Sequence, residues 1–228
     1  MKKQINPNLL ALAKQTCNHE LEMPDMNKLE KQKVATTDAH DLKDYIWVPS
    51  AEIYVAKQRT HLNLNWNQTH EQLNQEGLFM PTIPQFIEFI KYLKSQPNNQ
   101  KYQQILDDIL TIREPWRANW LDAYFEQRND GMYVLTKNKT YAEKLEPCLT
   151  EDKTPGISLE HWLNNSTKQG LPKPKCKKGD LYYWYPRNES VAWFYALSDW
   201  ANLNCNRNPS SRYSGLGVFA CAPKGRAL

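Results

Sequence analysis

The sequence lacks the short motifs on which many catalytic and nucleotide-binding sites are built. It contains no G-x-G-x-x-G fingerprint, no P-loop, no H-E-x-x-H zinc motif and no G-x-S-x-G nucleophile elbow. Its five histidines are scattered, and none lies at ligand spacing from another. Asp107 and Asp108 fall inside an expected helix and are expected to face solvent, whereas Asp122 lies on an expected strand and could face either way. With no catalytic constellation, we do not expect an enzyme.

Long hydrophobic runs are also missing. Nowhere do eighteen apolar residues follow one another, so we expect no membrane span. The apolar run LLALA at 9–13 is too short for a secretory signal and ends at Lys14 and Gln15. We therefore expect synthesis in the cytoplasm without a signal peptide.

Cysteines are few and irregularly spaced. Their number is odd and no two have C-x-x-C spacing, which favours neither a disulfide framework nor a zinc knuckle. Cys205 and Cys221 could form a redox pair if they were close, but one buried and one exposed thiol is the plainer expectation. The segment CNHE at 17–20 has too few ligands for a metal site by itself. We expect no metal and no cofactor. The five cysteines are Cys17, Cys148, Cys176, Cys205 and Cys221.

Charge of one sign is not concentrated. The chain has 29 Lys and Arg against 25 Asp and Glu, a net charge of +4. The densest basic run is KPKCKKG at 173–179, a proline-containing stretch that is expected to be a solvated loop. Dedicated nucleic-acid binders carry a stronger and more organised basic surface. A nucleic-acid-binding accessory protein, using this run and exposed aromatic rings for stacking, remains the alternative function.

Hydrophobic periodicity predicts several helices. Apolar residues recur at i, i+3, i+4 and i+7 in PTIPQFIEFIKYLKSQ at 81–96, and a similar stripe follows over 102–109. Both stripes are expected to be core. Another helix is expected from about Asn67 to a terminating glycine, and a short one at 158–165 with Ser158 as its N-cap.

Strands are expected before and after these helices. The segment YIWVPSAEIYVAKQ at 45–58 reads as two short strands broken at Pro49, and NDG at 129–131 predicts a β-hairpin. Because helices precede an aromatic-rich sheet, we expect an α+β fold with one domain over 44–228, after a polar, partly helical arm over 1–43. Three further strand-like runs lie at 181–186, 191–197 and 216–222.

The most unusual stretch is SDWANLNCNRNPSSRYSGLGVFACA at 198–222, where Asn occupies every second position from 202 to 208. In the preceding strand, Phe194 and Ala196 suit the core, which leaves Trp193, Tyr195 and Leu197 on the other face. Large apolar residues on the surface of a polar protein indicate a binding patch. Aromatic anchors surrounded by Asn, Ser and Arg are typical of a paratope rather than an enzyme cleft.

A plainer interpretation of this stretch stays open. The segment NLNWN at 63–67 shows the same alternation without any sign of a binding site. Trp193 and Tyr195 could also face the core instead of solvent. From the residues alone, a ligand surface and an Asn-rich composition are therefore both possible.

The segment 179–220, GDLYYWYPRNESVAWFYALSDWANLNCNRNPSSRYSGLGVFA, resembles the C-terminal region of variable proteins that diversity-generating retroelements diversify. The likeness is greatest to those of archaeal viruses and of small-genome archaea and bacteria. In this family the ending SGLGV, at 214–218 here, follows a hypervariable run. The segments 77–94, 114–125 and 151–173 resemble the constant part of the same proteins.

The resemblance implies a C-type lectin fold, with two main helices packed on a small, mostly antiparallel sheet. It also implies that a reverse transcriptase copies a template repeat with errors at adenines, and that the copy replaces the 3′ end of this gene. Asn codons are rich in adenine, so such errors convert Asn into many residue types. Formylglycine-generating enzymes have a related fold, but neither Cys205 nor Cys221 matches a catalytic motif, so such an oxidase is the lesser alternative.

The implied function is binding of a macromolecular ligand, a surface protein or a glycan, by a protein displayed on a virion or cell surface. Binding would use a variable region at 193–213 held by a rigid scaffold. The scaffold positions expected between the variable ones are Phe194, Ala196, Ala201, Leu203, Cys205 and Pro209. The expected variable, ligand-binding positions are Trp193, Tyr195, Leu197, Trp200, Asn202, Asn204, Asn206, Asn208, Ser211 and Tyr213.

Overall fold

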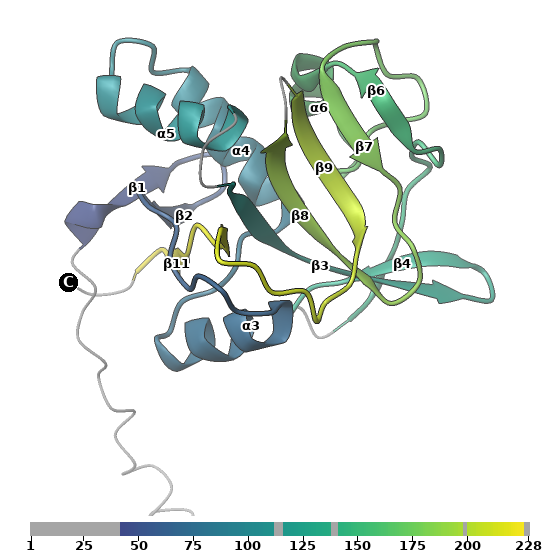
Figure 1. Cartoon of the computed structure of the whole chain (residues 1–228), viewed down its shortest axis with the longest axis horizontal. Coiled ribbons are helices and arrows are strands. Elements are labelled where there is room, and N and C mark those ends of the chain that lie inside the picture. The colour runs from purple at the N-terminus through teal and green to yellow at the C-terminus, as the bar shows by residue number, and fades with distance from the viewer. Residues whose placement is uncertain (1–41, 112–115, 138–140, 198–199, 226–228) are drawn as a thin grey trace, which may run out of the picture. The chain divides into compact units, whose positions relative to one another are not determined.

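The computed structural model describes residues 42–111, 116–137, 141–197 and 200–225 (Figure 1). The expected arm over 1–43 and the segment CNHE lie outside these residues, apart from the last two positions of the arm. The first half of the described chain contains the 3-10 helix η1 (Leu42–Asp44), β1 (Tyr45–Val48), β2 (Ile53–Ala56), α3 (Trp66–Gln75), α4 (Ile83–Lys94) and α5 (Gln100–Leu110). The second half contains β3 (Ala118–Arg128), β4 (Gly131–Leu135), β5 (Glu143–Lys144), β6 (Lys153–Ile157), α6 (Leu159–Asn165), β7 (Leu181–Trp184), β8 (Ser190–Leu197), β9 (Trp200–Arg207), β10 (Leu216–Gly217) and β11 (Cys221–Pro223).

These strands form two sheets. The smaller has the order β1-β2-β11 and is antiparallel, so it pairs the first two described strands with the last one. The larger has the order β5-β4-β3-β8-β9-β7-β6, with β10 pairing beside β3. Strands β7 and β9 run parallel, as do β3 and β10, and the other pairs among the described strands are antiparallel. The expected α+β class is confirmed.

The expectation of two main helices on a small sheet was too simple for the part that the structure describes. Four α-helices are present there, and the larger sheet has eight strands. The physical reason is that the centre of this sheet is buried on both faces, so elements are needed to cover each of them. In Figure 1 the three-stranded sheet lies between the α4–α5 pair and α3.

Local sequence explains why α4 forms where it does. Thr82 accepts a hydrogen bond from the N–H of Gln85, whose side chain accepts one from the N–H of Thr82, a reciprocal capping box. Pro84 stands in the first turn, where its missing N–H costs nothing. The predicted stripe is fully buried, with Phe86 and Phe89 at most 1% exposed. The core interpretation of this helix is confirmed.

Two apolar clusters lie on opposite faces of the larger sheet. One joins α4, α5 and α6 to Phe194 and Leu203, and the ring of Phe194 lies 5.3 Å from Phe86 and 5.8 Å from Trp162. The other joins α3 and β3 to Val191 and Trp193. Strand β8 therefore contributes to core on both sides, which fixes its backbone at the centre of the sheet.

No helix among the described residues is both long and apolar enough to cross a bilayer.

Candidate ligand-binding surface

The Asn-rich run is a strand, β9, which the sequence patterns did not predict. It pairs antiparallel with β8 and parallel with β7, so all three strands lie side by side (Figure 1). Paired residues project to the same face of a sheet. One row across this face is Trp184, Asn204 and Trp193, and the next is Tyr182, Asn202 and Tyr195. The Asn side chains of β9 thus stand between aromatic side chains on both neighbouring strands.

The opposite face of β8 and β9 is the scaffold that the sequence predicted. Phe194, Leu203 and Cys205 have no exposed surface, and Ala196 and Ala201 are also buried. The prediction of these as core residues is confirmed, and Phe194, Ala201, Leu203 and Cys205 belong to the cluster that includes α4 and α6. Pro209 is only half-buried, and its carbonyl oxygen accepts a hydrogen bond from the N–H of Trp66.

Seven of the ten expected variable positions are accessible. Leu197 is 49% and Tyr213 42% exposed. These two are the large apolar side chains that this surface offers to a partner. Asn208 is also exposed, and the half-buried positions are Tyr195, Trp200, Asn206 and Ser211.

The other three positions are buried, which corrects the expectation that they lie on the surface. Trp193 is 4%, Asn202 1% and Asn204 8% exposed. Trp193 is covered because its ring lies 5.5 Å from Trp116 and 5.6 Å from Trp120, with the Arg207 guanidinium 4.5 Å above it. The two Asn side chains are short, and larger aromatic neighbours shield them from solvent.

The Asn side chains also hold the backbone. The register of β8 with β9 shifts between Val191 and Trp193, so two residues of β9 oppose one of β8, which is a β-bulge. At this bulge, Asn204 Oδ1 accepts a hydrogen bond of 3.0 Å from the N–H of Asn206, and Ser190 Oγ donates one of 2.8 Å to the carbonyl of Cys205. Both bonds satisfy backbone groups that the bulge takes out of regular pairing.

Polar donors on this face are buried without a protein acceptor. Among the described residues, no partner lies within hydrogen-bonding distance of Nε1 of Trp184, Nε1 of Trp193 or Nε of Arg207. Burial raises the pKa of the Tyr195 phenol, although Arg207 and a hydrogen bond with Asn204 partly oppose this shift. The phenol is therefore neutral at pH 7 and can donate.

Aromatic rings extend the surface beyond the predicted positions. Tyr182 stacks on Trp200 with ring centroids 5.6 Å apart and planes 13° apart. Trp116 contacts both Tyr195 and Tyr213 edge to face. Sequence reasoning missed Tyr182, Trp184 and Trp116 as surface residues. The alternation in LYYWYP could have identified the first two, since residues two apart share one face of a strand.

The cysteines give no support to redox chemistry. The four described cysteines are free thiols, and both Cys205 and Cys221 are fully buried, so the expectation of one exposed thiol among these two was wrong. Burial raises the pKa of each thiol well above its usual value. A buried, protonated thiol is a poor nucleophile.

Asp122 faces the interior, which resolves the open question of its direction. Both of its carboxylate oxygens accept hydrogen bonds from the N–H of Lys137, at 3.0 and 3.1 Å. His70 Nε2 lies 3.3 Å from Asp122 Oδ1, and both side chains are buried. These contacts join α3 to the loop after β4 and lie apart from β9. No group of three or more potential metal ligands occurs in the part of the chain that the structure describes.

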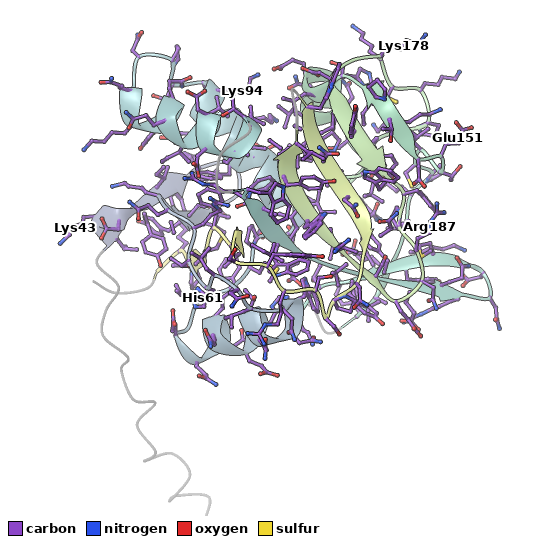
Figure 2. All side chains as sticks on the ribbon, viewed as in Figure 1. Lys43, His61, Lys94, Glu151, Lys178 and Arg187 are labelled. Carbon is purple, nitrogen blue, oxygen red and sulfur yellow. The ribbon has the colours of Figure 1, made fainter. Side chains whose placement is uncertain are left out.

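The basic run at 173–179 is an exposed loop, as predicted. Figure 2 shows Lys178, Glu151 and Arg187 along the same side of the described chain, beside β6 and β7. Arg187 pairs with Asp152 at 2.7 Å, and Lys153 pairs with Glu151. Cations and carboxylates are thus interleaved here, which weakens the attraction of this side for a polyanion.

The face of β7, β8 and β9 thus combines aromatic side chains and amides over a buried scaffold. Asp108, expected to face solvent, instead contacts Arg59 and Arg117 at another place on the surface.

Comparison of the chain with protein-family models, with curated proteins and with solved structures gives no match.

Proposed function

We propose that this chain binds a macromolecular ligand, a surface protein or a glycan, through the face formed by β7, β8 and β9 and the segment 208–213. The observation that carries the proposal is the division of residues along β8 and β9. Alternate side chains pack into a fully buried scaffold, while those between them form a face rich in aromatic and amide groups. Binding is thus separated from folding, and no catalytic group is needed.

The backbone of this face is well suited to recognition because it is held from both sides. Strand β8 is hydrogen-bonded between β3 and β9, and β9 between β8 and β7. The ring of Phe194 is stacked on Trp162 beneath them. Such a face loses little conformational entropy on binding, so more of the contact energy appears as affinity.

We further propose that the fold is of the C-type lectin type and that the ten expected variable positions are diversified through adenine-directed errors. Pairing of β1 and β2 with β11 and the place of the Asn-rich run on β9 support this proposal. Changes at Leu197, Asn208 and Tyr213 would alter contacts with ligand at little cost to folding. Changes at the buried Trp193, Asn202 and Asn204 would act on the support of the surface instead.

Sequencing of the DNA beside this gene tests the proposed diversification. We expect a near-copy of the 3′ end of the gene, next to a reverse transcriptase gene. The copy should differ only where it carries adenine, at codons of the ten positions named above. Absence of a copy, or differences spread over all bases, would refute diversification and leave the binding proposal to be tested separately.

Binding is tested with a glycan array and a panel of purified cell-surface proteins. We expect Trp200→Ser and Tyr213→Ser to lower affinity at least about ten-fold, since aromatic anchors commonly carry interface energy. Tyr141→Ser is the matched control, because Tyr141 is also a large exposed side chain, on the segment before β5. Binding only to single-stranded oligonucleotides, with steep loss at rising salt, would favour the nucleic-acid alternative instead.

A further inference from the structure

A second concave site lies where the segment after β2 meets α5 and the start of β3. Its volume is about 670 Å³, within the range of sites that hold small organic ligands. Its charged lining residues come from three places in the sequence, and the backbone of Ser214 and Gly215 closes one side. Trp116 and Leu62 give it an apolar wall, and Leu62 is 52% exposed at the rim.

The charges in this site do not balance. Four cationic side chains line it, Lys57, Arg59, Lys101 and Arg117, whereas Asp108 is the one carboxylate among its described lining residues. Arg59 Nη2 lies 3.5 Å from Asp108 Oδ2, and Arg117 Nη1 contacts Asp108 Oδ1. Two guanidinium groups therefore share a single carboxylate. Among the described lining residues, four positive charges against one negative charge leave a surplus of three.

Arg59 is fixed in place before any ligand arrives. Its side chain is only 9% exposed, and Nη1 donates a hydrogen bond of 3.2 Å to the carbonyl of Gly215. Gly215 itself is packed so closely that an added Cβ would meet the carbonyl oxygen of Trp116 at 1.7 Å. Burial, and after it the charge of Arg117, lowers the pKa of the Arg59 guanidinium to about 10. Its positive charge is thus incompletely compensated.

A guanidinium carries five N–H donors in a planar fork that matches phosphate and sulfate oxygens. The described contacts use two of these donors on Arg59 and one on Arg117. Lys101 on α5 is exposed at the same site and adds a flexible ammonium group. The apolar wall of Trp116 and Leu62 lies beside these cations, where the organic part of an ester would rest.

We propose that this site binds a tetrahedral oxyanion, the phosphate or sulfate group of an organic ester, between Arg59, Arg117 and Lys101. The surplus of three positive charges remains after Asp108 is counted. A ligand with a dianionic phosphate therefore fits it better than a ligand with one carboxylate. The inference does not depend on the proposed function of β9, since none of the ten positions named for that surface lines this site.

The test is calorimetric titration of the full chain with inorganic phosphate, phenyl phosphate, phenyl sulfate and benzoate, at constant ionic strength in chloride. We expect saturable binding of phenyl phosphate at one site, tighter than inorganic phosphate because the ring contacts Trp116. Arg117→Gln should weaken phenyl phosphate about ten-fold, since charge-assisted hydrogen bonds are lost. Benzoate binding as tightly as the two esters would overturn the assignment to a tetrahedral oxyanion.

Two further variants separate binding from folding. Lys101→Gln removes an exposed charge and should weaken phenyl phosphate about three-fold with the melting temperature unchanged. Asp108→Asn removes the carboxylate that competes with the ligand for Arg59 and Arg117, and it should strengthen the binding of phenyl phosphate. If Asp108 served only to hold the two arginines in place, its replacement would not strengthen binding. Arg128→Gln is the control, because Arg128 also pairs with a carboxylate, Glu126 at 3.0 Å, but lies elsewhere. Equal affinities of Arg117→Gln, Lys101→Gln and Arg128→Gln would refute the proposal, as would absence of saturable binding.

Discussion

Replacing Asn204 by alanine tests whether a buried amide of β9 supports the backbone. Asn204 is 8% exposed, and its Oδ1 accepts from the N–H of Asn206 at the bulge. A buried N–H without a partner costs about 1–3 kcal/mol. Because Asn206 is half-buried, water can reach part of this region, and we expect a loss of about 1–2 kcal/mol in the free energy of unfolding.

Asn208→Ala is a matched control for this change. Asn208 Oδ1 accepts an equivalent hydrogen bond, of 2.8 Å, from the N–H two residues ahead, at Ser210. Both variants therefore lose the same type of bond from the same type of residue. Asn208 is exposed, so water replaces its side chain and the loss should stay within about 0.5 kcal/mol.

Urea unfolding followed by circular dichroism measures the difference. With a urea m-value of about 2–3 kcal/mol per molar, Asn204→Ala should lower the midpoint by about 0.5 M while the m-value stays unchanged. The midpoint of Asn208→Ala should match that of the unmodified chain. If the two variants had equal urea midpoints, whether both lowered or both unchanged, burial of the Asn204 hydrogen bond would not decide how much it contributes to stability.

Three further outcomes follow from burial. Phe194→Ala should cost about 3–5 kcal/mol in urea unfolding, whereas Leu197→Ala on the same strand should stay within about 0.5 kcal/mol, and similar losses would contradict the assignment of faces. In peptide mapping after alkylation of the folded chain at pH 8, Cys176 should react while Cys205 stays unmodified until urea is added, and early labelling of Cys205 would argue against its burial. Burial raises the pKa of Tyr183 above its usual 10.0. Above pH 10 its phenol therefore stays protonated in the folded chain while it ionises in the unfolded chain. The stability that this group contributes is complete below pH 10 and falls as the pH rises further. Tyr183→Phe should reduce that alkaline loss in urea midpoints measured from pH 8 to 11, and an unchanged pH profile would contradict it.

The helices could be predicted because their signals are local. The apolar stripe of 81–96 and the capping residues of α4 lie within one turn or two of each other. The hairpin turn at 129–131 could be predicted in the same way, because NDG is a local turn signal. In the structure, Gly131 adopts a φ of +143°, which glycine tolerates best. The alternation of Ala201, Leu203 and Cys205 with Asn was also in the sequence as the period-two signal of a half-buried strand. These three residues were expected as scaffold, but no strand was predicted over 200–207, and so β9 itself was missed.

The sequence alone determined the α+β class, the stripes of α4 and α5, and the inward direction of Phe194, because each depends on spacing between neighbours in the chain. The tertiary structure alone decided that Trp193, Asn202 and Asn204 are buried. A period of two separates the faces of a strand but cannot tell whether the second face is covered. Whether that face is covered depends on residues far away in the sequence, such as Trp116 and Trp120, which pack against Trp193. The sharing of Asp108 by Arg59 and Arg117 likewise arises only when the segment after β2, α5 and β3 meet.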